Sequence, residues 1–391
     1  MNETLPSTKL SSEETKLKDL LRANSPAQRK KWALKAKSEG KKVVGLLCTF
    51  VPVELIHGAG MFPWRVSGTW QSHVYRALAW RDLDMCKYAT HVLESMLEGE
   101  YDFLDGVIAS DWDDDRRRLY DVWKLAGKQA FVEIVTMPKK ATELSVGYFA
   151  QELRRLASHL ERAGGQKIAP EGMREAIETR NHTRRLIGRL YEMRKRDVPP
   201  LTGAEFLGLT TAAMVMEPGE FNQRLEELWA FLETRDPGIA VGGPRVMISS
   251  DLLDNPTYVE IVENEGCLVA MDDLDTGSRY GWEMVDMQAE DPFEALARRY
   301  AHRPQDPPAL DWERQAQQII DWAREYNIDG VIELADDFSP PRRWRWPFFS
   351  RTLAAASIPV VRIPREYGIA STGPLQTRIR AFLEMIGQEL L

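Results

Sequence analysis

Apolar residues in the first part of the chain form two kinds of pattern that follow each other in turn. Residues 41–50 and 130–135 are continuous apolar runs next to charges, which is typical of strands buried on both faces of a parallel sheet. Residues 106–109 predict another such strand. Apolar residues at helical spacing predict helices over 53–59, 81–97 and 116–125. Because strands and helices alternate, we expect an α/β domain over residues 41–140.

The pattern changes before and after this domain. Residues 1–40 are polar and rich in lysine, with leucines at helical spacing, and predict an N-terminal helical arm. Residues 141–235 carry apolar positions at helical spacing without any strand pattern between them. We therefore expect a helical segment there, with Pro218 in the first turn of its last helix.

Strand and helix patterns alternate again in the last part of the chain, over residues 236–391. Strands are predicted at 245–250, 267–273, 330–334 and 358–363. Helices are predicted near 258–264, 311–326, 348–356 and 375–391. The fold class we predict is α/β, with two related doubly wound parallel-sheet domains joined by a helical segment.

A repeated stretch supports the idea of duplication. The sequence LDGVIASDWDDDRRRLY begins at Leu104, and IDGVIELADDFSPPRRW begins at Ile328. In each copy a buried strand is followed by acids, arginines and a helix. Because ligands of such sheets bind at the carboxyl ends of the strands, both charged runs are expected at a binding edge.

Net charge and cysteine content limit the classes of function and the cellular setting that we expect. The formal net charge is −8, which argues against a general nucleic-acid binder. Only three cysteines occur, without paired spacing, which favours a reduced, cytoplasmic setting. Neither a signal peptide nor a membrane span is recognisable, so we expect a soluble protein without a membrane partner.

Several motifs occur together in an order known from one family. LLCTFVPVELIHGAG, DGVI followed by RRLYDVWK, VVRIPREYG and QTRIRAFLEM resemble the subunits of 2-hydroxyacyl-CoA dehydratases and benzoyl-CoA reductases. The resemblance covers about residues 40 to 388. It implies a two-subunit enzyme that reduces an acyl-CoA thioester by one low-potential electron, which an ATP-dependent iron-sulfur activator protein supplies.

The resemblance also implies a 4Fe-4S cluster in each typical subunit, held by three cysteines. Cys86 stands at the first ligand position, but Asp113 and Ser339 stand at or beside the other two. Carboxylate and hydroxyl oxygens are hard donors that replace a thiolate poorly on cluster iron. We therefore expect that this chain has lost its cluster and works with a homologous, cluster-bearing partner subunit.

Other interpretations stay open at this point. The chain could keep an atypical cluster, helped by Cys48 or Cys267, and act as a homodimer, although both cysteines lie in apolar strand contexts. It could also be a non-catalytic scaffold or a regulatory homologue. The acyl group and the branch of the family are not readable from the sequence.

Glu54 and His57 are the candidate catalytic residues. Glu54 opens a helix directly after a buried strand, and the resemblance implies a position near the thioester. Burial could raise the pKa of this carboxyl group and let it exchange protons near neutrality. Gly58 and Gly60 predict a close backbone approach, either for helix packing or for the pantetheine arm of coenzyme A.

Two further stretches are candidates for binding the coenzyme A part of the substrate. Arg342 and Arg343 belong to an arginine- and tryptophan-rich run that could clamp phosphates or make a contact between subunits. Ser371 and Thr372 precede a helix whose free N–H groups could hold a phosphate, or they could simply cap it. Phosphate-loop and dinucleotide-binding fingerprints are both missing, so neither ATP nor a nicotinamide cofactor is expected on this chain.

Overall fold

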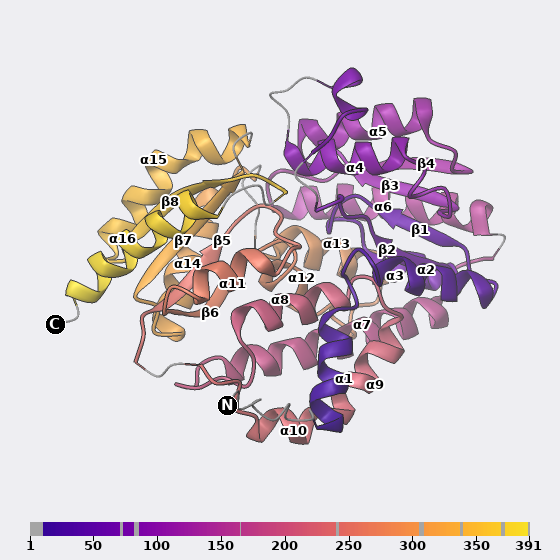
Figure 1. Cartoon of the computed structure of the whole chain (residues 1–391). Helices are drawn as coiled ribbons and strands as arrows, with labels where there is room; N and C mark the ends of the chain where they lie inside the picture. Colours follow the sequence, from indigo (N-terminus) through magenta and orange to yellow (C-terminus); the bar gives the residue numbers. More distant parts are fainter. Residues whose placement is uncertain are drawn as a thin grey trace, which may run out of the picture.

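The computed structural model consists of two parallel sheets with helices packed around them (Figure 1). It describes residues 11–70, 73–81, 86–164, 166–239, 242–304, 309–336, 339–368 and 372–389. The first sheet has the strand order β2-β1-β3-β4 and the second has β6-β5-β7-β8, and every strand pair is parallel. The predicted fold class is confirmed, and both sheets have the same strand order relative to the chain.

We call the part built on β1–β4 the first lobe. Its strands are β1 (Val43–Leu46), β2 (Phe62–Arg65), β3 (Gly106–Ser110) and β4 (Phe131–Val135). Its helices are α1 (Ser12–Leu21), α2 (Arg29–Ser38), α3 (Val53–Gly58), η1 (Ala77–Ala79), α4 (Lys87–Leu97) and α5 (Asp114–Ala126). Successive residues of β1 point into different cores, since Val43 packs in one apolar cluster and Val44 in another. This two-sided burial explains the continuous apolar run.

The helical segment between the sheets is long and amphipathic. It comprises α6 (Glu143–Gly164), α7 (Pro170–Met193), α8 (Gly203–Ala212), α9 (Pro218–Glu227) and α10 (Trp229–Thr234). Pro218 stands at the start of α9, as predicted. No helix in the described parts of the chain is both long enough and apolar enough to cross a membrane.

The second lobe is built on β5–β8. Its strands are β5 (Arg245–Ser249), β6 (Leu268–Asp273), β7 (Gly330–Asp336) and β8 (Val360–Arg365). Its helices are α11 (Thr257–Glu263), α12 (Ser278–Gly281), α13 (Pro292–His302), α14 (Trp312–Glu325), α15 (Pro340–Ala355) and α16 (Gly373–Glu389). Helix α15 packs with α14, whereas α16 packs with α11, so the two pairs cover opposite faces of the sheet.

The aspartate of each repeated DGVI stretch makes the same bond in its own lobe. The Asp105 carboxylate accepts a hydrogen bond of 2.7 Å from the backbone N–H of Val43. The Asp329 carboxylate accepts one of 2.7 Å from the backbone N–H of Arg245. Each aspartate thus ties the start of the third strand of its sheet to the start of the neighbouring strand. The repeat is therefore equivalent in structure as well as in sequence.

One segment of the second half packs in the first lobe. Helix α13 lies against α6, and residues such as Val285, Leu296 and Ala309 share an apolar core with α3 and β1. The domain boundary expected at residue 236 puts this segment with the second sheet. No helix was predicted over α13, and nothing local in the sequence shows which sheet a segment covers.

Several elements differ from the predictions. Helix α13 was not predicted, and the helix expected over 81–97 is found as α4, which begins at Lys87. Strand β2 was not predicted, because Pro63 and the short four-residue run hide it. Strand β1 is shorter than residues 41–50, since the chain leaves the sheet after Leu46. Helix α15 begins at Pro340 instead of near Phe348, because prolines fit the first turn of a helix.

Candidate functional site

Three residues from different parts of the chain meet in a small pocket between the lobes. Cys86 precedes α4, Asp113 precedes α5 and Ser339 precedes α15, and all three line this pocket. Its volume is about 40 Å³, which corresponds to the space of a few water molecules. The three positions singled out from the sequence are therefore neighbours in space.

Acids on the first-lobe side of this pocket are paired with arginines. Asp113 accepts a hydrogen bond of 2.7 Å from the backbone of Arg116 and forms an ion pair with its guanidinium group. Asp115 lies 2.6 Å from Arg81 and accepts a bond of 3.2 Å from the backbone N–H of Cys86. The acidic run after β3 thus serves both as a helix cap and as the partner of buried cations.

Acids on the second-lobe side of this pocket are also paired with arginines. Asp251 lies 2.5 Å from Arg342, and burial, which alone would raise the pKa of Asp251, is outweighed by Arg342 and a hydrogen bond from Ser339. The pKa of Asp251 is therefore about 2. Asp336 forms an ion pair of 3.2 Å with Arg365. Arg342 thus favours the charged form of Asp251, whereas burial outweighs Arg81 and raises the pKa of Asp115.

Glu54 is completely buried and ionised. Its carboxylate forms an ion pair with Arg184 of α7 and accepts a hydrogen bond of 2.9 Å from the Tyr300 hydroxyl of α13. Burial alone would raise the pKa of Glu54, but Arg184 and Arg299 outweigh it and lower this pKa. The expected rise of the pKa was wrong, because the sequence did not show that two arginines from distant helices surround this carboxylate.

His57, Gly58 and Gly60 line a different pocket, of about 300 Å³, together with Lys41 and Glu217. Burial and then Arg180 hold the pKa of His57 well below its usual range, so the imidazole is neutral. Arg180 lies 2.9 Å from its Nε2 atom.

The two glycines of this pocket allow helix packing. Gly60 has a φ of +72°, and a Cβ atom there would lie 2.4 Å from the Gln166 side chain. At Gly58 a Cβ atom would lie 3.2 Å from Ile168. Both glycines thus allow close contact with the loop between α6 and α7, and a site for the pantetheine arm stays a prediction.

The predicted phosphate-binding residues lie apart from each other. Arg342 is buried and contacts Asp251 and Glu333, the latter at 2.9 Å, whereas Arg343 is exposed. Thr372 precedes α16, and its carbonyl accepts a hydrogen bond of 2.9 Å from the backbone N–H of Gln376. Ser371 lies outside the described residues. Whether Arg343 and Thr372 bind a cofactor stays a prediction.

Sequence reasoning missed the partners of these groups. Asp251 and Asp336 line the pocket between the lobes, and Arg81 pairs with its lining residue Asp115. Arg184 and Tyr300 belong to the Glu54 site. Asp251 and Asp336 follow or end the strands β5 and β7, so the rule that sites lie at carboxyl strand ends could have found them. The partners of Glu54 carry no such local signal.

The fold and the pocket define a class, namely proteins with two duplicated parallel sheets that face a common interlobe site. The family model of the 2-hydroxyglutaryl-CoA dehydratase D-component matches residues 48–386. The chain therefore belongs to this family.

Relatives with known names cover nearly the whole chain. The (R)-phenyllactyl-CoA dehydratase beta subunit of Clostridium sporogenes is 24% identical over 91% of this chain and 95% of its own length. One of the benzoyl-CoA reductase subunits of Thauera aromatica is 24% identical over 88% of this chain and 91% of its own length. The beta subunit of (R)-2-hydroxyglutaryl-CoA dehydratase of Acidaminococcus fermentans is 25% identical, with coverages of 90% and 94%.

The residues of the interlobe pocket do not fit an iron-sulfur cluster. Cys86 is the one thiol that lines it, and burial together with Asp115 and Asp336 raises the pKa of this thiol to about 12. The oxygen donors are already engaged, since Asp113 pairs with Arg116 and Ser339 bonds to Asp251. Cys48 and Cys267 do not line the pocket, and each bonds elsewhere, to Ser110 and to the Val262 carbonyl. Within the described ranges, no group of three His, Cys, Asp or Glu side chains is arranged to hold a metal ion.

Proposed function

We propose that this chain is the cluster-free subunit of a two-subunit enzyme that acts on an acyl-CoA thioester. The observation that carries the proposal is the donor set of the interlobe pocket. Cys86 is the one thiol that lines it, and the acids around it, Asp113, Asp115, Asp251 and Asp336, are paired with arginines. Membership of the family, and relatives that are named as subunits of dehydratases and of a benzoyl-CoA reductase, support the subunit role.

Under this proposal the redox centre belongs to a homologous companion subunit. A separate iron-sulfur activator that hydrolyses ATP delivers low-potential electrons to the companion, and the substrate is reduced there by one electron. This chain shapes the complex. Its ion pairs fix the position of α4, α5 and α15 around the interlobe pocket, and these helices lie on the upper side of the molecule in the view of Figure 1.

The second candidate function is a scaffold or regulatory homologue without a part in the chemistry. One observation favours it: Glu54 is completely buried and fixed by Arg184 and Tyr300 instead of facing an open cavity. Both functions require a companion subunit, but only the first requires that the complex binds and converts an acyl-CoA.

The test uses the chain produced together with the product of its adjacent gene under anaerobic conditions. We expect the two chains to purify as one complex and to bind an acyl-CoA thioester in equilibrium dialysis. A complex that binds no acyl-CoA would contradict the enzyme-subunit function and would support the scaffold function. Failure of the two chains to associate would contradict both functions.

A further inference from the structure

Helix α15 carries an exposed stripe of arginine and aromatic residues. Arg343, Trp344, Pro347, Phe348 and Arg351 are all exposed, at the three- and four-residue spacing of one helix face. Trp344 is 82% exposed and Phe348 is 57% exposed. Large aromatic side chains at such exposure are typical of surfaces that become covered by a partner. We call these five residues the α15 stripe.

Two of the four arginines of α15 are buried, and the other two are exposed on the α15 stripe. Arg342 and Arg345 are buried, the first against Asp251 and Glu333 and the second 2.5 Å from Gln315. The side chains of Arg343 and Arg351 make neither a hydrogen bond nor an ion pair with the described residues. Residues 340–355 contain no acid at all, in a chain whose net charge is −8. The stripe is therefore a basic, apolar surface whose charges lack partners among the described residues of its own chain.

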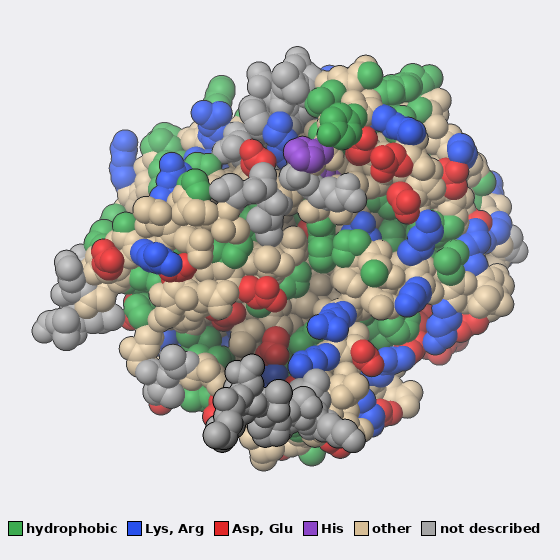
Figure 2. Space-filling model, viewed as in Figure 1, with side chains coloured by type: hydrophobic (Ala, Val, Ile, Leu, Met, Phe, Trp, Pro, Cys, Tyr) green, Lys and Arg blue, Asp and Glu red, His purple; other side chains and the backbone are tan. Residues whose placement is uncertain are grey.

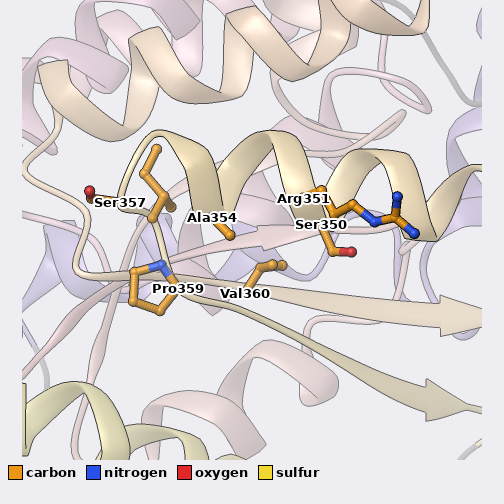
Figure 3. Close-up of a pocket in the computed structure, with 7 residues that line it drawn as sticks. Ser350, Arg351, Ala354, Ser357, Pro359 and Val360 are labelled. Carbon is orange, nitrogen blue, oxygen red and sulfur yellow. The ribbon is translucent and has the colours of Figure 1, made fainter.

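A groove extends this surface towards the edge of the second sheet. It has a volume of about 590 Å³ and lies between α15 and β8, which is an edge strand. Figure 3 shows Ser350 and Ala354 pointing from the helix towards Pro359 and Val360. Arg351 lines the groove and also belongs to the stripe. Blue and green side chains gather at the upper left of Figure 2, where Figure 1 places α15.

We propose that the α15 stripe and this groove form the docking face for the companion subunit, which presents carboxylates around an apolar patch. The inference rests on the proposed function and adds the location and chemistry of the contact. Charge complementarity carries it, because Arg343 and Arg351 are exposed cations that a partner's carboxylates would complement, and α15 itself contains no acid. Helix α15 begins beside Ser339, so a companion docked on the stripe also lies next to the interlobe pocket.

A second copy of this chain fits the face poorly. In a two-fold symmetric dimer the same patch meets itself, which would bring Arg343 and Arg351 against the basic stripe of the other copy. Like charges at an interface cost affinity, so a different, acidic partner surface is required.

The experiment measures the dissociation constant between this chain and the product of its adjacent gene by calorimetry. We expect Trp344→Ala with Phe348→Ala to weaken binding by about 30-fold or more, as for aromatic hot spots. Arg343→Glu with Arg351→Glu should weaken binding by at least about 10-fold and remove most of its salt dependence. The matched control is Arg378→Glu on α16, an exposed arginine that covers the opposite face of the same sheet, and it should leave binding unchanged.

Each outcome separates this inference from the proposed function. Tight binding by the wild-type chain that all three variants retain would overturn the docking face and leave the subunit role intact. Binding lost equally in the Arg378→Glu control would overturn it too. No binding by the wild-type chain would contradict the proposed function itself. A homodimer of this chain alone, dissociated by the stripe variants, would show that the occupant is a second copy and would overturn the acidic companion. Circular dichroism of each variant controls for folding.

Discussion

At the scale of single residues, Glu54 acts as a buried anion in the structure. Its ion pair with Arg184 joins α3 to α7, and its bond from Tyr300 joins α3 to α13. The sequence predicted its place at the carboxyl end of β1, since strand and helix patterns meet there. The direction of its pKa was not predictable, because both arginines that lower it come from segments far along the chain.

Glu54→Gln should destabilise the protein strongly. The substitution leaves the buried Arg184 without its counter-charge, which costs about 3–5 kcal/mol for a broken buried pair. Urea unfolding followed by tryptophan fluorescence measures this loss. Glu143→Gln is the matched control, because Glu143 pairs with Arg298 at the surface. The loss of this surface ion pair should change the free energy of unfolding little.

The contribution of Glu54 should depend on pH with a definite sign. Because the folded-state pKa is lowered, the stability it contributes is fully present above the unfolded-state pKa of about 4.3 and is lost as pH falls through the folded-state value. The difference in unfolding free energy between wild type and Glu54→Gln should therefore shrink in acid. A difference that grows with acid would mean that the pKa of Glu54 is raised.

At the scale of elements, the duplicated DGVI stretch has one physical role in both lobes. Asp105 and Asp329 each accept a bond from the first residue of the neighbouring strand, and the strand after each aspartate lies third in its sheet. Apolar runs and the repeat predicted these strands well. Strand β2 and the early start of α15 were harder to predict, because β2 is four residues long and contains a proline, and two prolines open α15.

Asp105→Ala and Asp329→Ala should destabilise by similar amounts. Each removes a hydrogen bond from a backbone N–H to a carboxylate, which contributes about 1.5–3 kcal/mol. Chemical denaturation of both variants tests the equivalence. Asp105→Asn and Asp329→Asn keep a side-chain acceptor and should lower the free energy of unfolding clearly less. A loss of stability in only one of the two alanine variants would contradict the equivalence.

At the scale of the whole molecule, one buried acid connects the lobes. Asp275 follows β6 and accepts a hydrogen bond from Thr49, which follows β1, and it lies 3.4 Å from Arg65 at the end of β2. Arg303 donates a bond of 3.0 Å to the Thr49 carbonyl and forms an ion pair of 3.5 Å with Asp275. Such contacts between strand ends of different sheets could not be predicted, since nothing local in the sequence shows how two sheets face each other. The same reason explains why residues 236–391 were taken as one domain, although α13 within this range packs in the first lobe.

Asp275→Asn should weaken the coupling between the lobes. It removes the charge that faces Arg65 and Arg303, which costs about 3–5 kcal/mol as for other broken buried pairs. Differential scanning calorimetry should show one transition for the wild type and a broadened or split transition for the variant. A single sharp transition at the wild-type temperature would contradict the role of Asp275.

We propose that this chain binds no cluster of its own and depends on a companion for its redox centre. The decisive measurement is the content of iron and acid-labile sulfide per chain, on anaerobically purified protein without its companion. We expect far less than one iron atom per chain before and after reconstitution with iron and sulfide. About four iron and four sulfide per chain, lost on Cys86→Ala, would contradict it.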